Sequence, residues 1–101
     1  MMQNTHIVYI LAGNTNGPIF IDAASDLPTR LKQHKSGKLR DDRFRIDQLV
    51  YVEAYDCVLK AKTRAKALKT ASREWLDRLI SSRNPNWQDL SVALIKQAKA
   101  A

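Results

Sequence analysis

The chain has little cysteine, few acidic residues and no long apolar run, and each of these shortages excludes a class of protein. Cys57 is the single cysteine among 101 residues, so an internal disulfide and a Cys-x-x-Cys zinc pair are both excluded. No apolar run approaches the roughly 18 residues that a membrane-spanning helix needs. The first residues contain neither the basic segment nor the cleavage site of a signal peptide. We therefore expect a cytoplasmic protein with no membrane partner.

Acidic residues are scarce beside basic ones, at 10 against 17, and the net charge is +7 at pH 7. Residues 30–45 and 60–78 hold seven basic residues each. Two solvated helix faces would explain these stretches, but binding to a nucleic acid is favoured, because helices rarely carry so many cations with so few acids. We expect DNA rather than RNA. The candidate nucleic-acid-binding residues are Lys32, Lys35, Lys38, Arg40, Arg43 and Arg45.

Three short runs rich in β-branched and aromatic residues predict strands. The first covers residues 6–12, and a cluster of glycine, asparagine and proline follows it. The second begins at Ile19 and stops on Asp22, which predicts an antiparallel pair with the first. The third covers residues 49–55. Asp22 is unexpected, because a buried strand has little use for a carboxylate where it meets its next turn.

Helical spacing of apolar residues accounts for most of the remaining chain. Asp26 can cap a first helix that ends near Ser36. Residues 38–47 are predicted to form a basic loop. A further helix is predicted to start near Ser72. The apolar stripes of the second and third helices are Val58, Ala61, Ala65 and Leu68, and Trp75, Leu76, Leu79 and Ile80. The order β-β-α-β-α-α predicts one α+β domain, a small three-stranded sheet flanked by helices. The domain covers residues 1–101, with its core at about 6–91 and a tail at 92–101.

The order and spacing of these segments resemble the GIY-YIG nuclease superfamily, and within it the small bacterial single-domain branch. Val8-Tyr9 and Phe20-Ile21-Asp22 stand at the two strand motifs, and Arg30 and His34 follow on the next helix. The later segments that carry the resemblance are LVYVEAY at 49–55, RAKALK at 64–69, SREW at 72–75 and NPNWQDL at 84–90. The resemblance implies a GIY-YIG-like fold and a metal-dependent endonuclease of the kind used in DNA repair.

The resemblance also implies four catalytic residues: Tyr9, Arg30, His34 and Asn84. In the family, tyrosine phenols position or deprotonate the attacking water, and an arginine balances charge on the phosphate. One carboxylate holds a Mg²⁺ or Mn²⁺ ion that polarises the phosphate. Simpler explanations stay open: Tyr9 as a core aromatic, Arg30 as a surface cation, His34 as a helix-end residue, and Asn84 as part of a helix-ending turn.

Three positions depart from the family pattern. Phe20 replaces the tyrosine of the second motif, Asp22 replaces its glycine, and Ala65 replaces the metal-binding glutamate. Phe20 has no hydroxyl for proton transfer, and Ala65 cannot ligate a metal. These changes predict a nucleic-acid-binding domain whose cleavage is lost or weak, with no metal ligand and no cofactor.

Two other functions stay open. One is an active endonuclease that uses Mg²⁺ or Mn²⁺ with Asp22 as a relocated metal ligand. The other is a protein-interaction module on the same scaffold.

Overall fold

The computed structural model of the chain describes residues 6–13, 17–35 and 48–91, and from Gln33 to Lys35 it describes the backbone alone. The elements are β1 (His6–Ala12), β2 (Ile19–Ala24), α1 (Leu27–Lys35), β3 (Gln48–Tyr55), α2 (Val58–Thr70) and α3 (Arg73–Arg83). This is the predicted β-β-α-β-α-α order of an α+β fold. The predicted basic loop at 38–47 and the tail at 92–101 lie outside the described residues.

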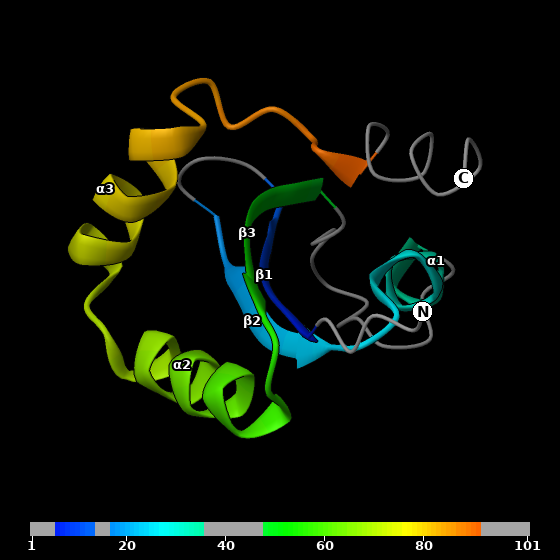
Figure 1. The fold of residues 1–101 in the computed structure, drawn as a ribbon. Coiled ribbons are helices and arrows are strands. Elements are labelled where there is room, and N and C mark those ends of the chain that lie inside the picture. The colour runs from blue at the N-terminus through cyan, green and yellow to red at the C-terminus, as the bar shows by residue number, and fades with distance from the viewer. Residues whose placement is uncertain (1–5, 14–16, 36–47, 92–101) are drawn as a thin grey trace.

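The three strands form one antiparallel sheet in the order β2-β1-β3, so β1 is central and β2 and β3 are its edges. Figure 1 shows α1 on one face of this sheet and α2 and α3 on the other. Residues 8–12 of β1 are fully buried, which explains why this strand is an almost continuous apolar run instead of an alternating one.

Each face of the sheet has its own core. On the α1 face, Leu27 and Leu31 pack with Tyr9, Leu11 and Leu49. The opposite face is larger, and its buried residues from the two helices are Ala61, Ala65, Leu68, Leu76 and Ile80. Alternate residues of one strand therefore belong to different cores, as the two-residue repeat of a strand requires. Among the described residues, no helix has the length and apolar content to cross a membrane.

The predicted cap of the first helix is confirmed, and the predicted start near Ser72 is also a cap. Asp26 accepts hydrogen bonds at the start of α1 from the backbone N–H of Thr29 at 3.3 Å and from its hydroxyl at 2.7 Å. Ser72 accepts the backbone N–H of Trp75 at 3.1 Å at the start of α3. Each cap supplies an acceptor to an N–H group that has no partner within the helix.

Three details of the sequence prediction are wrong. Strand β2 does not stop at Asp22 but continues to Ala24, because Ala23 and Ala24 pair with β1 opposite Val8 and Ile7. Val58 is 48% exposed, since it is the first residue of α2, ahead of the stripe that packs on the sheet. Trp75 is 39% exposed and lies beside Arg64 instead of in the core.

Candidate functional site

Tyr9, Asp22 and Arg30 meet on the α1 side of the sheet. Tyr9 and Asp22 are directly opposite each other in the pairing of β1 with β2, so their side chains lie on one face. Arg30, from the first turn of α1, places its guanidinium 3.5 Å from the Asp22 carboxylate. The other Asp22 oxygen accepts the backbone N–H of Ala23 at 2.8 Å. Three residues from three elements thus form one polar cluster, which includes two of the predicted site residues.

Tyr9 is fully buried in this cluster, and its ring lies 6.2 Å from that of Phe20, tilted by 44°. Burial, together with the negative charge of Asp22, raises the pKa of Tyr9 to about 12, although the charge of Arg30 and a hydrogen bond from it act in the opposite direction. A phenol with this pKa is ionised in roughly one molecule in 10⁵ at pH 7. Tyr9 is therefore almost wholly protonated at neutral pH, and its phenolate is rarely present to act as a base.

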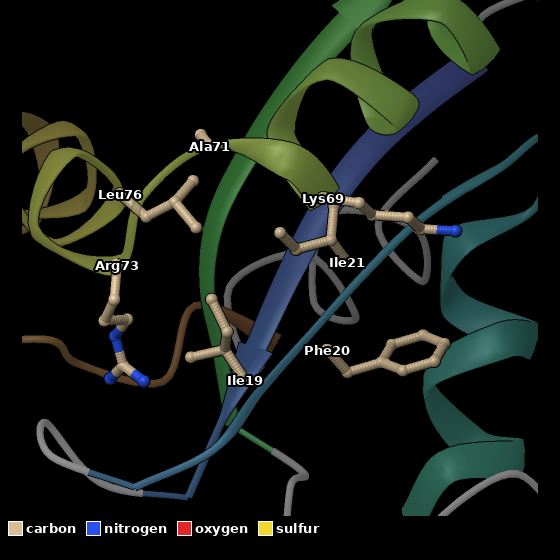
Figure 2. Close-up of a pocket in the computed structure, with 7 residues that line it drawn as sticks. All are labelled: Ile19, Phe20, Ile21, Lys69, Ala71, Arg73 and Leu76. Atoms are coloured by element: carbon tan, nitrogen blue, oxygen red, sulfur yellow. The ribbon is translucent and has the colours of Figure 1, made fainter.

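Ala65 and Asp22 line the same surface depression, which has a volume of about 360 Å³. The other lining residues are Ala23, Lys62, Lys66 and Lys69. Figure 2 shows Lys69 reaching from α2 across β2, while Phe20 points toward α1. The position where the resemblance expects a metal-binding glutamate is thus next to Asp22, but it carries a methyl group and is surrounded by lysines.

These residues do not fit a divalent cation. Mg²⁺ needs oxygen ligands and usually takes one or two carboxylates from the protein. Asp22 is the one carboxylate here, with one oxygen on a backbone N–H and the other facing Arg30. Across the described part of the chain, no three histidine, cysteine or acidic side chains gather as metal ligands would. The positive charge around Asp22 opposes a cation further.

The depression beside Asp22 is the middle one of three along β2. One neighbour, of about 400 Å³, shares Lys69 with it and extends past Ile19 to Arg73. The other, of about 230 Å³, shares Lys62 and Ala23 with it and is also lined by Arg30. The three together are called the β2-edge groove below. It follows the side of β2 that pairs with no other described strand.

The lysines of this groove were not predicted as site residues. Lys62, Lys66 and Lys69 are spaced by four and three residues, which places them on one face of α2. The spacing is visible in the sequence, but only the packing of α2 shows that this face lies along β2. Of the cations that were predicted, Lys32 is exposed on α1. The side chain of Lys35 lies outside the described residues, as do Lys38, Arg40, Arg43 and Arg45.

The two remaining predicted catalytic residues are Asn84 and His34. Asn84 is buried at the end of α3, where its amide nitrogen donates to the carbonyls of Val50 at 3.0 Å and Gln88 at 2.9 Å. Its amide oxygen accepts the N–H of Gln88 at 3.0 Å. This arrangement is the helix-ending turn that the sequence left open, and a catalytic role stays a prediction. His34 is in the last turn of α1, and its side chain lies outside the described residues.

A second polar cluster, missed from the sequence, lies at the β3 edge. Arg64 binds Glu53 with two hydrogen bonds of 3.0 and 3.1 Å, and the hydroxyls of Tyr51 and Tyr55 also donate to this carboxylate. Burial alone would raise the pKa of Glu53, but the hydrogen bonds from Arg64, Tyr51 and Tyr55 outweigh it and lower this pKa. Burial and the bond to Glu53 raise the pKa of Tyr51 to about 12. The cluster joins α2 to β3 and leaves no carboxylate oxygen free.

Comparisons with known proteins support the fold. No protein-family model matches the chain, and no curated protein matches it in sequence. Among solved structures, the chain is similar to the solution NMR structure of a UPF0213 protein from Bacillus halodurans, with 27% sequence identity and a TM-score of 0.52. The similarity covers 84% of this chain and 92% of that one. UPF0213 is a family of GIY-YIG-like fold, so the comparison supports the resemblance to GIY-YIG nucleases at the level of the fold.

Proposed function

We propose that this chain is a nucleic-acid-binding domain, of the small single-domain GIY-YIG type, in which phosphodiester cleavage is lost or weak. The observation that carries the proposal is the middle of the β2-edge groove. Three lysines line it, and the position expected to hold a metal-binding carboxylate is Ala65. Cations without a metal ligand suit the binding of a phosphate backbone and not its hydrolysis.

The charge distribution supports the binding half of the proposal. Lys62, Lys66 and Lys69 form no ion pair with any other described residue. Such lysines can neutralise phosphates and release the counterions of a nucleic acid, which makes binding strong at low salt and weak at high salt. DNA is the proposed partner and the cytoplasm the proposed location.

The chemistry of the cluster of Tyr9, Asp22 and Arg30 supports the proposal that cleavage is lost or weak. A positioned acid or base typically contributes about 10²- to 10⁴-fold to a rate. Tyr9 keeps its proton at neutral pH, and its raised pKa makes the phenolate rarer than that of an ordinary tyrosine. Phe20 offers no hydroxyl. Arg30, the candidate partner of the phosphate, already faces the Asp22 carboxylate. Each of these features disfavours cleavage and leaves the positive surface in place.

Two measurements test the proposal. Fluorescence anisotropy with labelled duplex DNA should show binding that weakens steeply as salt rises, and a plasmid nicking assay with Mg²⁺ or Mn²⁺ should show no nicking above background. Any nicking should be checked with Arg30→Ala, because activity that survives this change points to a contaminant. Salt-independent binding would contradict the proposed binding of nucleic acid. Efficient nicking that Arg30→Ala abolishes would contradict the proposed loss or weakness of cleavage.

An active nuclease with Asp22 as its metal ligand is the second candidate, and one observation favours it. Asp22 lines the same depression as Ala65, so a carboxylate has been lost and another gained within one site. NMR spectra recorded during a Mn²⁺ titration would decide, since bound Mn²⁺ broadens signals close to it. Broadening confined to Asp22 and Ala23 would support this candidate. A chain that neither binds DNA nor cuts it would instead favour the protein-interaction module.

A further inference from the structure

We propose that Asp22 is an internal competitor for phosphate: its carboxylate occupies Arg30 and so lowers the affinity of the β2-edge groove for phosphate groups. The inference rests on the proposed function, because it concerns the surface that would bind the nucleic acid. It adds a residue that tunes this surface and a chemical class of ligand, the phosphate ester or polyphosphate.

The groove places cations from two helices over one strand. Arg30 from α1 and Lys62 from α2 line the same depression, at the end of β2 nearest α1. Lys66 and Lys69 continue the positive charge along β2 on the α2 side. Asp22 is the one acidic residue among the described residues that line the three depressions. With Arg73 at the far end, a phosphate entering the groove therefore meets five cations and a single carboxylate.

Asp22 is held in place by its backbone contact and not by Arg30. The 2.8 Å hydrogen bond from the Ala23 N–H fixes one carboxylate oxygen, and the other oxygen is left to face Arg30 at the longer distance of 3.5 Å. Both side chains are about one-third exposed, at 37% for Asp22 and 35% for Arg30. Ion pairs of this length and exposure are weak, so a phosphate can displace the carboxylate from Arg30.

The two ligands of Arg30 are alternatives, because carboxylates and phosphates offer the guanidinium the same kind of acceptor oxygens. When phosphate takes Arg30, the Asp22 charge stays nearby, since the Ala23 N–H still holds it. The bound phosphate is then repelled by the Asp22 carboxylate, and a neutral side chain at this position would not repel it. Asp22→Asn is therefore the variant to test, because it keeps an oxygen for the Ala23 N–H and removes the charge.

The test compares the affinities of the wild-type chain and Asp22→Asn for two probes, inorganic tripolyphosphate and a short duplex DNA oligonucleotide, at low salt. Calorimetry gives the dissociation constants, and NMR shift mapping shows where each probe binds. We expect Asp22→Asn to bind both probes at least about fivefold more tightly, since charges about 4 Å apart interact at this level even in water. The largest shifts should fall on Arg30, Lys62 and Lys66.

Matched variants separate this effect from a general change in charge. Glu74→Gln removes one negative charge from an exposed position of α3 outside the groove, and it should alter both affinities less than twofold. Adding Arg30→Ala to Asp22→Asn should remove most of the gain in affinity for the two probes. Equal affinities of the wild-type chain and Asp22→Asn, or an equal gain in Glu74→Gln, would overturn the inference.

The two probes also separate this inference from the proposed function. An oligonucleotide that binds the wild-type chain and Asp22→Asn equally well overturns the inference and leaves the proposed function standing. Tripolyphosphate that binds Asp22→Asn more tightly, without any binding of the oligonucleotide, supports the inference and contradicts the nucleic-acid function. Failure of both probes to bind any variant overturns both.

Discussion

Tyr9 of β1 lies directly opposite Asp22 of β2, in the interior of the antiparallel pair. Residues paired in this way have Cβ atoms about 4.5–5.5 Å apart, so a phenol and a carboxylate share one small space with Arg30. The neighbouring carboxylate and the burial both favour the neutral phenol. Asp22 is therefore not a residue left at the end of a strand, as its place in the sequence indicated, but a central member of the cluster.

The first prediction concerns stability at alkaline pH. The pKa of Tyr9 is about 12 in the folded chain, against the ordinary tyrosine value of 10.0. Between these two values the folded state holds a proton that the unfolded state has lost, so stability falls as pH rises from about 10 to 12. We expect Tyr9→Phe to show a shallower fall over this range. Urea unfolding of both chains at about pH 9 and pH 12 measures the fall in the free energy of unfolding.

Tyr55→Phe is the comparison for this experiment, because the Tyr55 hydroxyl lies in the cluster at the β3 edge. Its hydrogen bond to Glu53 raises the pKa of Tyr55, so this variant should also flatten the fall in stability, but it leaves the contribution of Tyr9 in place. If the free energies of unfolding of Tyr9→Phe and the wild-type chain fall in parallel between these two pH values, the assigned environment of Tyr9 is wrong.

The second prediction is that Glu53→Gln lowers the free energy of unfolding by about 2 kcal/mol at neutral pH, because Arg64 and two tyrosine hydroxyls lose a charged acceptor. The folded-state pKa of Glu53 lies below 4.5. Its contribution is therefore present above about pH 4.5 and lost as pH falls through the folded-state value. Thermal unfolding from pH 7 down to about pH 3 should show the deficit of Glu53→Gln narrowing.

Exposed Glu74, paired with Arg78 at 4.0 Å, supplies the comparison for Glu53. We expect Glu74→Gln to change stability by less than about 0.5 kcal/mol, because exposed pairs contribute little. Equal effects of the two substitutions would mean that the cluster at the β3 edge adds nothing beyond an ordinary surface pair.

The elements, the cap of α1 and the start of α3 could be predicted from the sequence because their signals are local. The capping of α1 by Asp26 and of α3 by Ser72 depends on residues within a single turn. The extent of β2 is different. Ala23 and Ala24 carry no strong strand preference, and their place in β2 is decided by pairing with β1, which a reading of the segment alone does not reveal.

The candidate site could be predicted only in part, for a similar reason. Tyr9 and Arg30 were named through a resemblance, and the fold brings them together. The lysines of α2 were visible as a basic stretch, but their place beside Asp22 depends on how α2 packs across the sheet. In the cluster at the β3 edge, Arg64 of α2 contacts Glu53 of β3, eleven positions earlier in the chain. No local pattern in the sequence indicates this contact.

The third prediction is that Asn84→Ala lowers the free energy of unfolding by about 2 kcal/mol, because it leaves the buried Val50 carbonyl and the Gln88 backbone without their partners. Asn84→Asp keeps the acceptor for the Gln88 N–H, but it sets a buried carboxylate oxygen, which cannot donate, against the carbonyls of Val50 and Gln88, and should cost at least as much. Chemical denaturation of both variants measures the difference. DNA affinity, measured where both variants are fully folded, should match the wild-type value. A large loss of affinity in a folded Asn84→Ala would instead assign this residue to the binding surface.

The fourth prediction restores the missing carboxylate. Ala65→Glu combined with Asp22→Gly places a carboxylate at the position the resemblance expects and removes the one that faces Arg30. Because Ala65 is buried, we expect a stability loss of about 1–3 kcal/mol. Plasmid nicking with Mg²⁺ or Mn²⁺ should rise above that of the wild-type chain. Ala65→Gln with Asp22→Gly is the matched control, since it has the same size but no charge. Equal nicking by the two double variants would show that the carboxylate at position 65 is not what cleavage lacks.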